Sequence, residues 1–219
     1  SLYIRPFMFS TDNVIGVKPS ETYKFMIILS PTGPYYNAPM KIYVEEKYTR
    51  AAPGGVGFSK NAGNYGASML ATALAKKAGY DQVLWTDAFE HKYLQEVGTM
   101  NVFFIIGDTA VTPSLEEGTI LSGVTRDSAI TVLQEMGFKI EERKITIDDL
   151  INAHKSGALF EVFGTGTAAT ISLIKELKYK DYVMEFDVDQ WKTAPELKKR
   201  LNDIRYNRVP DNYGWMIKV

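Results

Sequence analysis

The stretch GGVGFSKNAGNYGAS, residues 54 to 68, places one lysine, Lys60, and one tyrosine, Tyr65, among five glycines. Glycine lets the backbone approach a ligand closely and permits positive φ angles, at an entropic cost. A lysine in such a loop can attack a carbonyl, including that of an aldehyde cofactor. The alternative is that Lys60 is an ordinary surface charge, because most lysines are exposed. The rest of the chain decides between these interpretations.

The composition indicates a globular protein. The 219 residues are 45% hydrophobic and carry a net charge of −1, which favours neither nucleic acid nor an anionic membrane as a partner. The longest apolar runs, residues 25–29 and 102–106, are strands by length and fall far short of the roughly 18 residues of a membrane span. The chain has no cysteine, which fits a cytoplasmic protein, and its two histidines are too few for most zinc sites.

Strands and helices alternate irregularly along the chain. Helical spacing follows the glycine stretch, with Met69, Leu70, Ala73 and Leu74 as its apolar positions, and three further helices are expected at cap signals near Thr125, Thr146 and Thr193. This order favours a mixed-sheet α/β or α+β domain over a regular doubly wound one. Strands are predicted at residues 2–9, 23–29, 41–45, 82–86, 101–106, 138–143 and 158–163.

Three other loops could carry chemistry, and each has a simpler interpretation. Residues 123–126 begin a helix, where free N–H groups can bind phosphate, but a capped helix has the same sequence. Residues 164–168, GTGTA, follow a strand and suit an anion, although strand-ending turns use the same residues. Glu96 stands among apolar residues just before a strand, where a buried acid needs a cationic partner.

Taken together, these weak signals match one ligand, pyridoxal 5′-phosphate. The cofactor has an aldehyde for the lysine, a phenolic oxygen for the tyrosine, a ring nitrogen that an acid keeps protonated, and a phosphate for N–H groups. No metal site is expected.

The motifs GGVGFSKNAGNY, LQEVGTMNVFF, ILSGVTRDS and EVFGTGTAA resemble, in this order, the large domain of branched-chain amino acid aminotransferases. SLYIRP, QVLW and YGWMIKV add to the resemblance, which covers essentially the whole chain. These are fold type IV pyridoxal-phosphate enzymes, related to D-amino-acid transaminases and aminodeoxychorismate lyases. The resemblance implies a mixed sheet partly closed into a barrel, with flanking helices, and a homodimer.

The resemblance also implies cofactor-binding roles. Lys60 would form the Schiff base and transfer the proton between the substrate α-carbon and the cofactor, Tyr65 would hydrogen-bond the ring oxygen, and Glu96 would face the ring nitrogen. The phosphate would be held by the backbone N–H groups of Val124 and Thr125 and by the hydroxyl of Thr167.

For substrate, the resemblance implies that Thr167 and Ala168 hold the α-carboxylate. Tyr3 and Arg5 match a family strand whose arginine meets the side-chain carboxylate of glutamate or 2-oxoglutarate. The pocket for the branched side chain of leucine, isoleucine or valine would be lined by Tyr35, Thr99 and Met100.

The chain begins with Ser1 in a sequence typical of a strand, so we expect it to start within a longer protein. Residues 1–219 would form the large cofactor-binding domain, and the family's small N-terminal domain, with an arginine that clamps the phosphate, would be absent. Residues 1–219 alone are therefore expected to bind cofactor poorly. Two alternatives stay open: another reaction on the same fold, or a non-catalytic domain whose glycine loops are only turns.

Overall fold

The computed structural model describes residues 2–33 and 38–218. The chain divides into two compact units, Ser1–Asn37 and Ala38–Val219. Within the described residues, no helix combines the length and apolar character needed to cross a membrane.

The first unit is one antiparallel hairpin. Its strands, β1 (Leu2–Ser10) and β2 (Tyr23–Pro31), pair from Leu2 opposite Pro31 to Ser10 opposite Tyr23. The carboxylate of Asp12 closes the connection by accepting hydrogen bonds from the N–H groups of Glu21 and Thr22, both at 2.9 Å. The sequence predicted both strands, and each extends by one or two residues beyond the predicted end.

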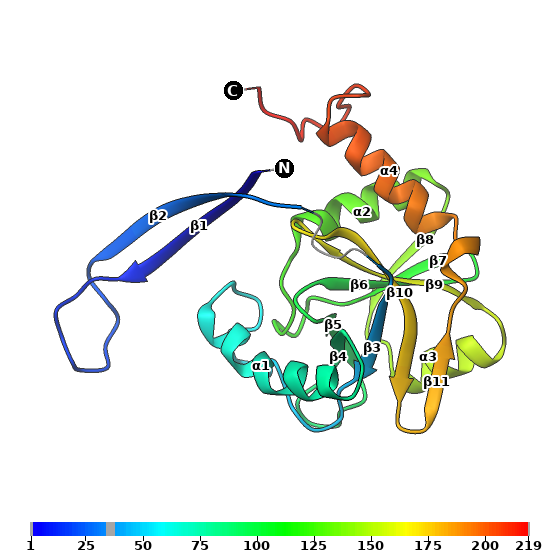
Figure 1. Ribbon diagram of the computed structural model, residues 1–219, viewed down its shortest axis with the longest axis horizontal. Helices are drawn as coiled ribbons and strands as arrows, with labels where there is room; N and C mark the ends of the chain where they lie inside the picture. Colours follow the sequence, from blue (N-terminus) through cyan, green and yellow to red (C-terminus); the bar gives the residue numbers. More distant parts are fainter. Residues whose placement is uncertain (1, 34–37, 219) are drawn as a thin grey trace. The chain divides into compact units, whose positions relative to one another are not determined.

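The second unit is built on a mixed sheet (Figure 1). In the described residues its strand order is β5-β4-β3-β10-β9-β6-β7-β8, with β11 paired to β10. β3 pairs in parallel with β4 and β10, β7 pairs in parallel with β8, and the other neighbours are antiparallel. The strands are β3 (Met40–Val44), β4 (Gln82–Thr86), β5 (Leu94–Val97), β6 (Asn101–Ile106), β7 (Thr109–Pro113), β8 (Lys139–Arg143), β9 (Leu159–Gly166), β10 (Thr170–Tyr179) and β11 (Tyr182–Glu185).

This sheet curls until its first strand meets its sixth. β5 and β6 are joined by a short turn that contains Gly98 and Thr99, and reciprocal backbone hydrogen bonds of 2.9 Å link Val97 to Met100. Gly98 has φ +57°, in the left-handed region that favours glycine. The mixed, partly closed sheet confirms the fold class predicted from the sequence.

Helix α1 (Ala62–Lys77) covers β4 through small side chains. Ala71 and Ala75 pack against Val83 and Trp85, which lets the helix lie close to the strand. The apolar positions predicted from the sequence do not form this buried face. Met69, Leu70 and Leu74 are between 46% and 68% exposed. Sequence spacing identified the helix but not its buried face, because a bulky tryptophan below it selects alanines.

Helices α2 (Val124–Glu135) and α4 (Thr193–Arg205) cover a second core that includes Phe103, Phe163 and Leu133. As predicted, Leu197, Leu201 and Ile204 of α4 are buried. Two predicted caps were wrong. The N-cap of α2 is Gly123, not Thr125, and the cap of α4 comes from elsewhere in the sequence.

That cap is the buried carboxylate of Glu161 on β9. It accepts hydrogen bonds from the backbone N–H groups of Lys192 at 2.9 Å, Thr193 at 2.7 Å and Ala194 at 2.7 Å. Helix α3 (Ile147–Lys155), by contrast, has the predicted local capping box between Thr146 and Asp149. Strands β5, β7, β10 and β11 were not predicted, because their short or lysine-rich sequences lack a clear period of two.

The loop that leads from β4 into β5 is organised by Asp87. Its carboxylate accepts four backbone hydrogen bonds of 2.8 to 3.1 Å across residues 89–93. Burial alone would raise the pKa of Asp87, but these N–H groups outweigh it and hold the pKa below its ordinary value. The loop thereby fixes where β5 begins.

We expect Asp87→Asn to destabilise the protein by about 2 kcal/mol at pH 7, because an amide cannot accept all four hydrogen bonds. Because the pKa of Asp87 is lower in the folded state, its ionised carboxylate contributes its full stabilisation above the pKa of the unfolded chain, about 3.9. This stabilisation is lost as the pH falls through the pKa of the folded state. The difference between wild type and variant in urea denaturation should therefore shrink below about pH 4. Asp181→Asn, at an exposed turn, is the control. A difference that is independent of pH would contradict this role.

Candidate functional site

One cleft of the second unit brings together residues from the glycine stretch and from the β5–β6 turn. Its volume is about 340 Å³, open mouth included. Four of the predicted site residues line it, namely Lys60, Tyr65, Glu96 and Thr99. The other lining residues are Arg50, Ser59, Asn64, Ser68, Gly98 and Leu121.

The loop that carries Lys60 is anchored to the first turn of α1. The Asn61 side chain caps this helix by accepting a hydrogen bond from the Asn64 N–H at 3.2 Å. The Asn64 amide in turn donates to the carbonyl groups of Val56 at 2.9 Å and Ser59 at 2.7 Å. These contacts leave Lys60 exposed at the mouth of the cleft, one residue before the cap.

Glu96 is the buried acid of the cleft. Its side chain is 5% exposed, and its Oε1 accepts a hydrogen bond from the Leu121 N–H at 2.8 Å. Burial raises the pKa of Glu96, while the charges of Arg50 and Lys60 and the Leu121 N–H act in the opposite direction. An acid in this environment is suited to pairing with a cation inside the cleft.

The glycine stretch needs glycine at residue 57 because the backbone passes close to two neighbouring segments. A Cβ atom at Gly57 would lie 2.5 Å from the Cβ of Ala51 and 2.6 Å from the carbonyl oxygen of Thr119. By contrast, a Cβ at Gly66, in α1, would have no described atom within 4 Å.

The predicted anion-binding loops do not line the cleft itself. At the start of α2, no side chain of the described residues caps the helix. Val124 is 77% exposed, and Thr125 is half-buried. Thr167 and Ala168 lie exposed in the turn between β9 and β10. Met100 is 4% exposed and packs beneath the backbone of β9, so it too lies outside the cleft lining. Roles for these residues stay predictions.

Three predicted substrate residues belong to the first unit. In the hairpin, the Arg5 guanidinium lies 5.0 Å from the centroid of the Tyr3 ring. Tyr35 falls outside the described residues. Their roles also stay predictions.

The sequence did not predict the part played by Arg50, Asn64 and Ser68. Asn64 could have been found from its spacing of three residues from Asn61, which is typical of a helix start. Arg50 precedes the glycine stretch in KYTRAAPGG, where a charged residue gives no local sign of burial. Among the described residues, no group of His, Cys, Asp or Glu side chains could hold a metal ion.

Comparisons of sequence and of structure both relate the chain to aminotransferases. The family model for amino-transferase class IV matches residues 1–177. The chain belongs to this family. A probable branched-chain-amino-acid aminotransferase of Staphylococcus epidermidis is 48% identical, and the match spans 100% of this chain and 62% of the relative. Branched-chain-amino-acid transaminase 1 of Bacillus subtilis is also 48% identical, over 100% of this chain and 63% of its own length.

Solved branched-chain aminotransferases share the fold. The crystal structure of the Escherichia coli branched-chain amino acid aminotransferase has a TM-score of 0.84 and 26% identity, over 99% of this chain and 70% of that one. The branched-chain aminotransferase of the thermophilic archaeon Thermoproteus uzoniensis, solved with norvaline, has a TM-score of 0.80 and 25% identity, over 94% and 65%. The chain spans about 62% of the length of the curated relatives that it matches.

We expect Gly57→Ala to destabilise the protein by about 2 kcal/mol, because the added methyl group overlaps the Ala51 side chain and the backbone carbonyl of Thr119. The matched Gly66→Ala change places a methyl group in open space on a helix and should be neutral or stabilising by up to about 1 kcal/mol. Thermal denaturation of the two full-length variants checks this. Equal stability of the two would show that the loop does not need its close approach at residue 57.

Proposed function

We propose that the full-length protein is a pyridoxal-phosphate-dependent branched-chain aminotransferase, which transfers the amino group of leucine, isoleucine or valine to 2-oxoglutarate. The observation that carries this proposal is that Lys60 and the buried Glu96 line the same cleft. Membership of the class IV aminotransferases and the names of the relatives support it.

The residues of the cleft, and separately the start of α2, offer groups that fit this cofactor. When bound, pyridoxal phosphate supplies an aldehyde for an amine and a ring that accepts electrons. Glu96 suits the protonated ring nitrogen, because its Oε2 accepts no hydrogen bond from the described residues and its nearest charged neighbour is cationic. At the start of α2, backbone N–H groups without a side-chain cap suit a phosphate.

In this proposal each residue has a separate task. Lys60 binds the cofactor through Nζ and afterwards moves the proton that leaves the substrate α-carbon. Glu96 holds a negative charge against the ring nitrogen, and Tyr65, which is 37% exposed and lines the same cleft as Lys60, donates to the ring oxygen. Val124, Thr125 and Thr167 hold the phosphate.

Substrate recognition is also part of the proposal. Thr167 and Ala168 bind the α-carboxylate, and Thr99 and Met100 shape the pocket for the branched side chain together with Tyr35. Arg5, beside Tyr3, meets the side-chain carboxylate of 2-oxoglutarate or glutamate. Such a set of residues suits an enzyme that takes an apolar and an acidic side chain in turn.

We further propose that residues 1–219 form the large domain of a cytoplasmic homodimer whose small domain lies outside this chain. The coverage of 62% of the relative's length is consistent with a further domain. The absence of cysteine supports the cytoplasm as the compartment.

We expect the full-length protein to develop a visible absorbance band when it is titrated with pyridoxal phosphate, and Lys60→Ala to abolish it, because the covalent link requires the amine. Lys77→Ala, an exposed lysine at the end of α1, is the control and should keep the band. Residues 1–219 alone should bind the cofactor more weakly. A wild-type protein without a band would refute the enzymatic function.

A panel of amino donors tests the substrate. We expect turnover with L-leucine, L-isoleucine and L-valine and 2-oxoglutarate, and at least roughly tenfold lower kcat/KM for Arg5→Ala with 2-oxoglutarate, since an Arg–carboxylate pair is lost. The same variant should react nearly normally in the half-reaction with L-leucine, followed by the cofactor spectrum. Activity with D-alanine and none with L-leucine would instead identify a D-amino-acid transaminase.

A further inference from the structure

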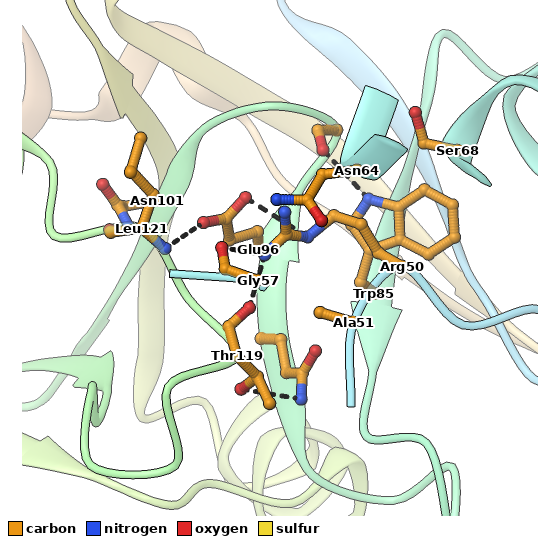
Figure 2. Close-up of polar contacts among 12 residues, drawn as sticks. Arg50, Ala51, Gly57, Asn64, Ser68, Trp85, Glu96, Asn101, Thr119 and Leu121 are labelled. Atoms are coloured by element: carbon orange, nitrogen blue, oxygen red, sulfur yellow. Dashed lines mark hydrogen bonds and ion pairs between the residues drawn. The ribbon is translucent and has the colours of Figure 1, made fainter. Parts of the chain in front are cut away.

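The guanidinium of Arg50 lies buried beneath the cleft and contacts three separate segments (Figure 2). Its side chain is only 7% exposed. One terminal nitrogen donates to the carbonyl oxygens of Thr119 and, at 3.4 Å, of Gly57. Its Nε lies 3.5 Å from Oε2 of Glu96 and has no hydrogen-bond partner among the described residues. Arg50 is therefore a buried cation whose charge faces Glu96.

Few other groups can influence the charge of Glu96. Arg50 faces it from the segment before the glycine stretch, Lys60 faces it from the stretch itself, and Tyr65 of α1 lines the same cleft. The neighbouring strands β4 and β6 and the segment 119–121 contain no charged residue. Arg50 is the buried one of the two cations, since Lys60 is exposed.

The remaining contacts of Arg50 restrain the loop that carries Lys60. Gly57 lies three residues before Lys60. The same Arg50 nitrogen donates to the carbonyl oxygen of Gly57 and to the carbonyl oxygen of Thr119. Thr119 in turn lies two residues before Leu121, whose N–H holds Oε1 of Glu96. A planar guanidinium can serve several acceptors in fixed directions, whereas a lysine ammonium on a flexible stem cannot.

We propose that Arg50 is a positioning residue, which places a fixed positive charge beside Glu96 before the cofactor arrives and joins the Lys60 loop to the segment that orients Glu96. This inference rests on the proposed function, because it assigns Glu96 to a cationic ring. Burial raises the pKa of Glu96 above its ordinary value, and the charge of Arg50, 3.5 Å away, limits that rise. The long Nε–Oε2 separation leaves Oε2 free to accept a stronger hydrogen bond from a ligand.

The test starts with the cofactor-free, full-length protein. With ¹³C-labelled glutamate side chains, the Glu96 resonance is assigned by its loss in Glu96→Gln and followed against pH by NMR. We expect Arg50→Met to move the Glu96 titration upward by at least about one unit, which is a tenfold change in the protonation equilibrium. Arg50→Lys should move it less, and Arg143→Met, on an exposed strand away from the cleft, should not move it.

Cofactor affinity gives the second readout, in a double-mutant cycle. We expect Arg50→Met to weaken pyridoxal phosphate binding at least roughly tenfold in the wild-type background, and less than about threefold beside Glu96→Gln. An unchanged Glu96 titration, or an equal loss of affinity in both backgrounds, would overturn the proposal and leave Arg50 as a structural residue.

Two results would need a further measurement: an Arg50→Met variant that does not fold, and a wild-type protein that binds no cofactor. If Arg50→Met does not fold, Arg50→Lys is used for the test. The lysine ammonium cannot serve the same acceptors as the planar guanidinium. A Glu96 titration and a cofactor affinity equal to those of the wild type would therefore overturn the proposal. If the wild-type protein binds no cofactor, the proposed function fails, and the NMR titration still tests the coupling between Arg50 and Glu96.

Discussion

The turn at Gly98 and Thr99 is the constraint on which the second unit depends. A short turn and two reciprocal hydrogen bonds return the chain from β5 to β6, although these strands stand first and sixth in the sheet order. Because the sheet must curl for these strands to meet, the turn closes the ring of strands. It also brings Glu96 to one side of the cleft and Thr99 to its rim.

In the second unit, the polar contacts follow a common rule: buried charges are matched by backbone groups as well as by other charges. Glu96 has the Leu121 N–H, Arg50 has two carbonyl oxygens, Asp87 has four N–H groups and Glu161 has three. Hydrogen bonds offset the cost of removing a charge from water. They also fix loops that no regular structure supports, such as the segment whose Leu121 N–H binds Glu96.

Much of the fold and part of the site could be predicted from the sequence. Apolar runs with clear ends identified most strands, and the glycine stretch and LQEVGTMN identified Lys60, Tyr65, Glu96 and Thr99, which meet in one cleft. The rest depended on partners distant in sequence. The buried face of α1 is selected by Trp85 beneath it, and the burial of Arg50 follows from contacts with residues 96 and 119. Local periodicity carries no information about such partners.

The cap of α4 has a consequence for the order of folding. Its first turn is completed by a carboxylate that lies 31 to 33 residues earlier, on β9, instead of by a neighbouring side chain. An isolated helix of 13 residues is marginal in water, because its nucleation is unfavourable. Closing a long loop must therefore precede the gain from that cap. This helix should form late, after β9 has joined the sheet, and a nascent chain that ends within α4 should lack it.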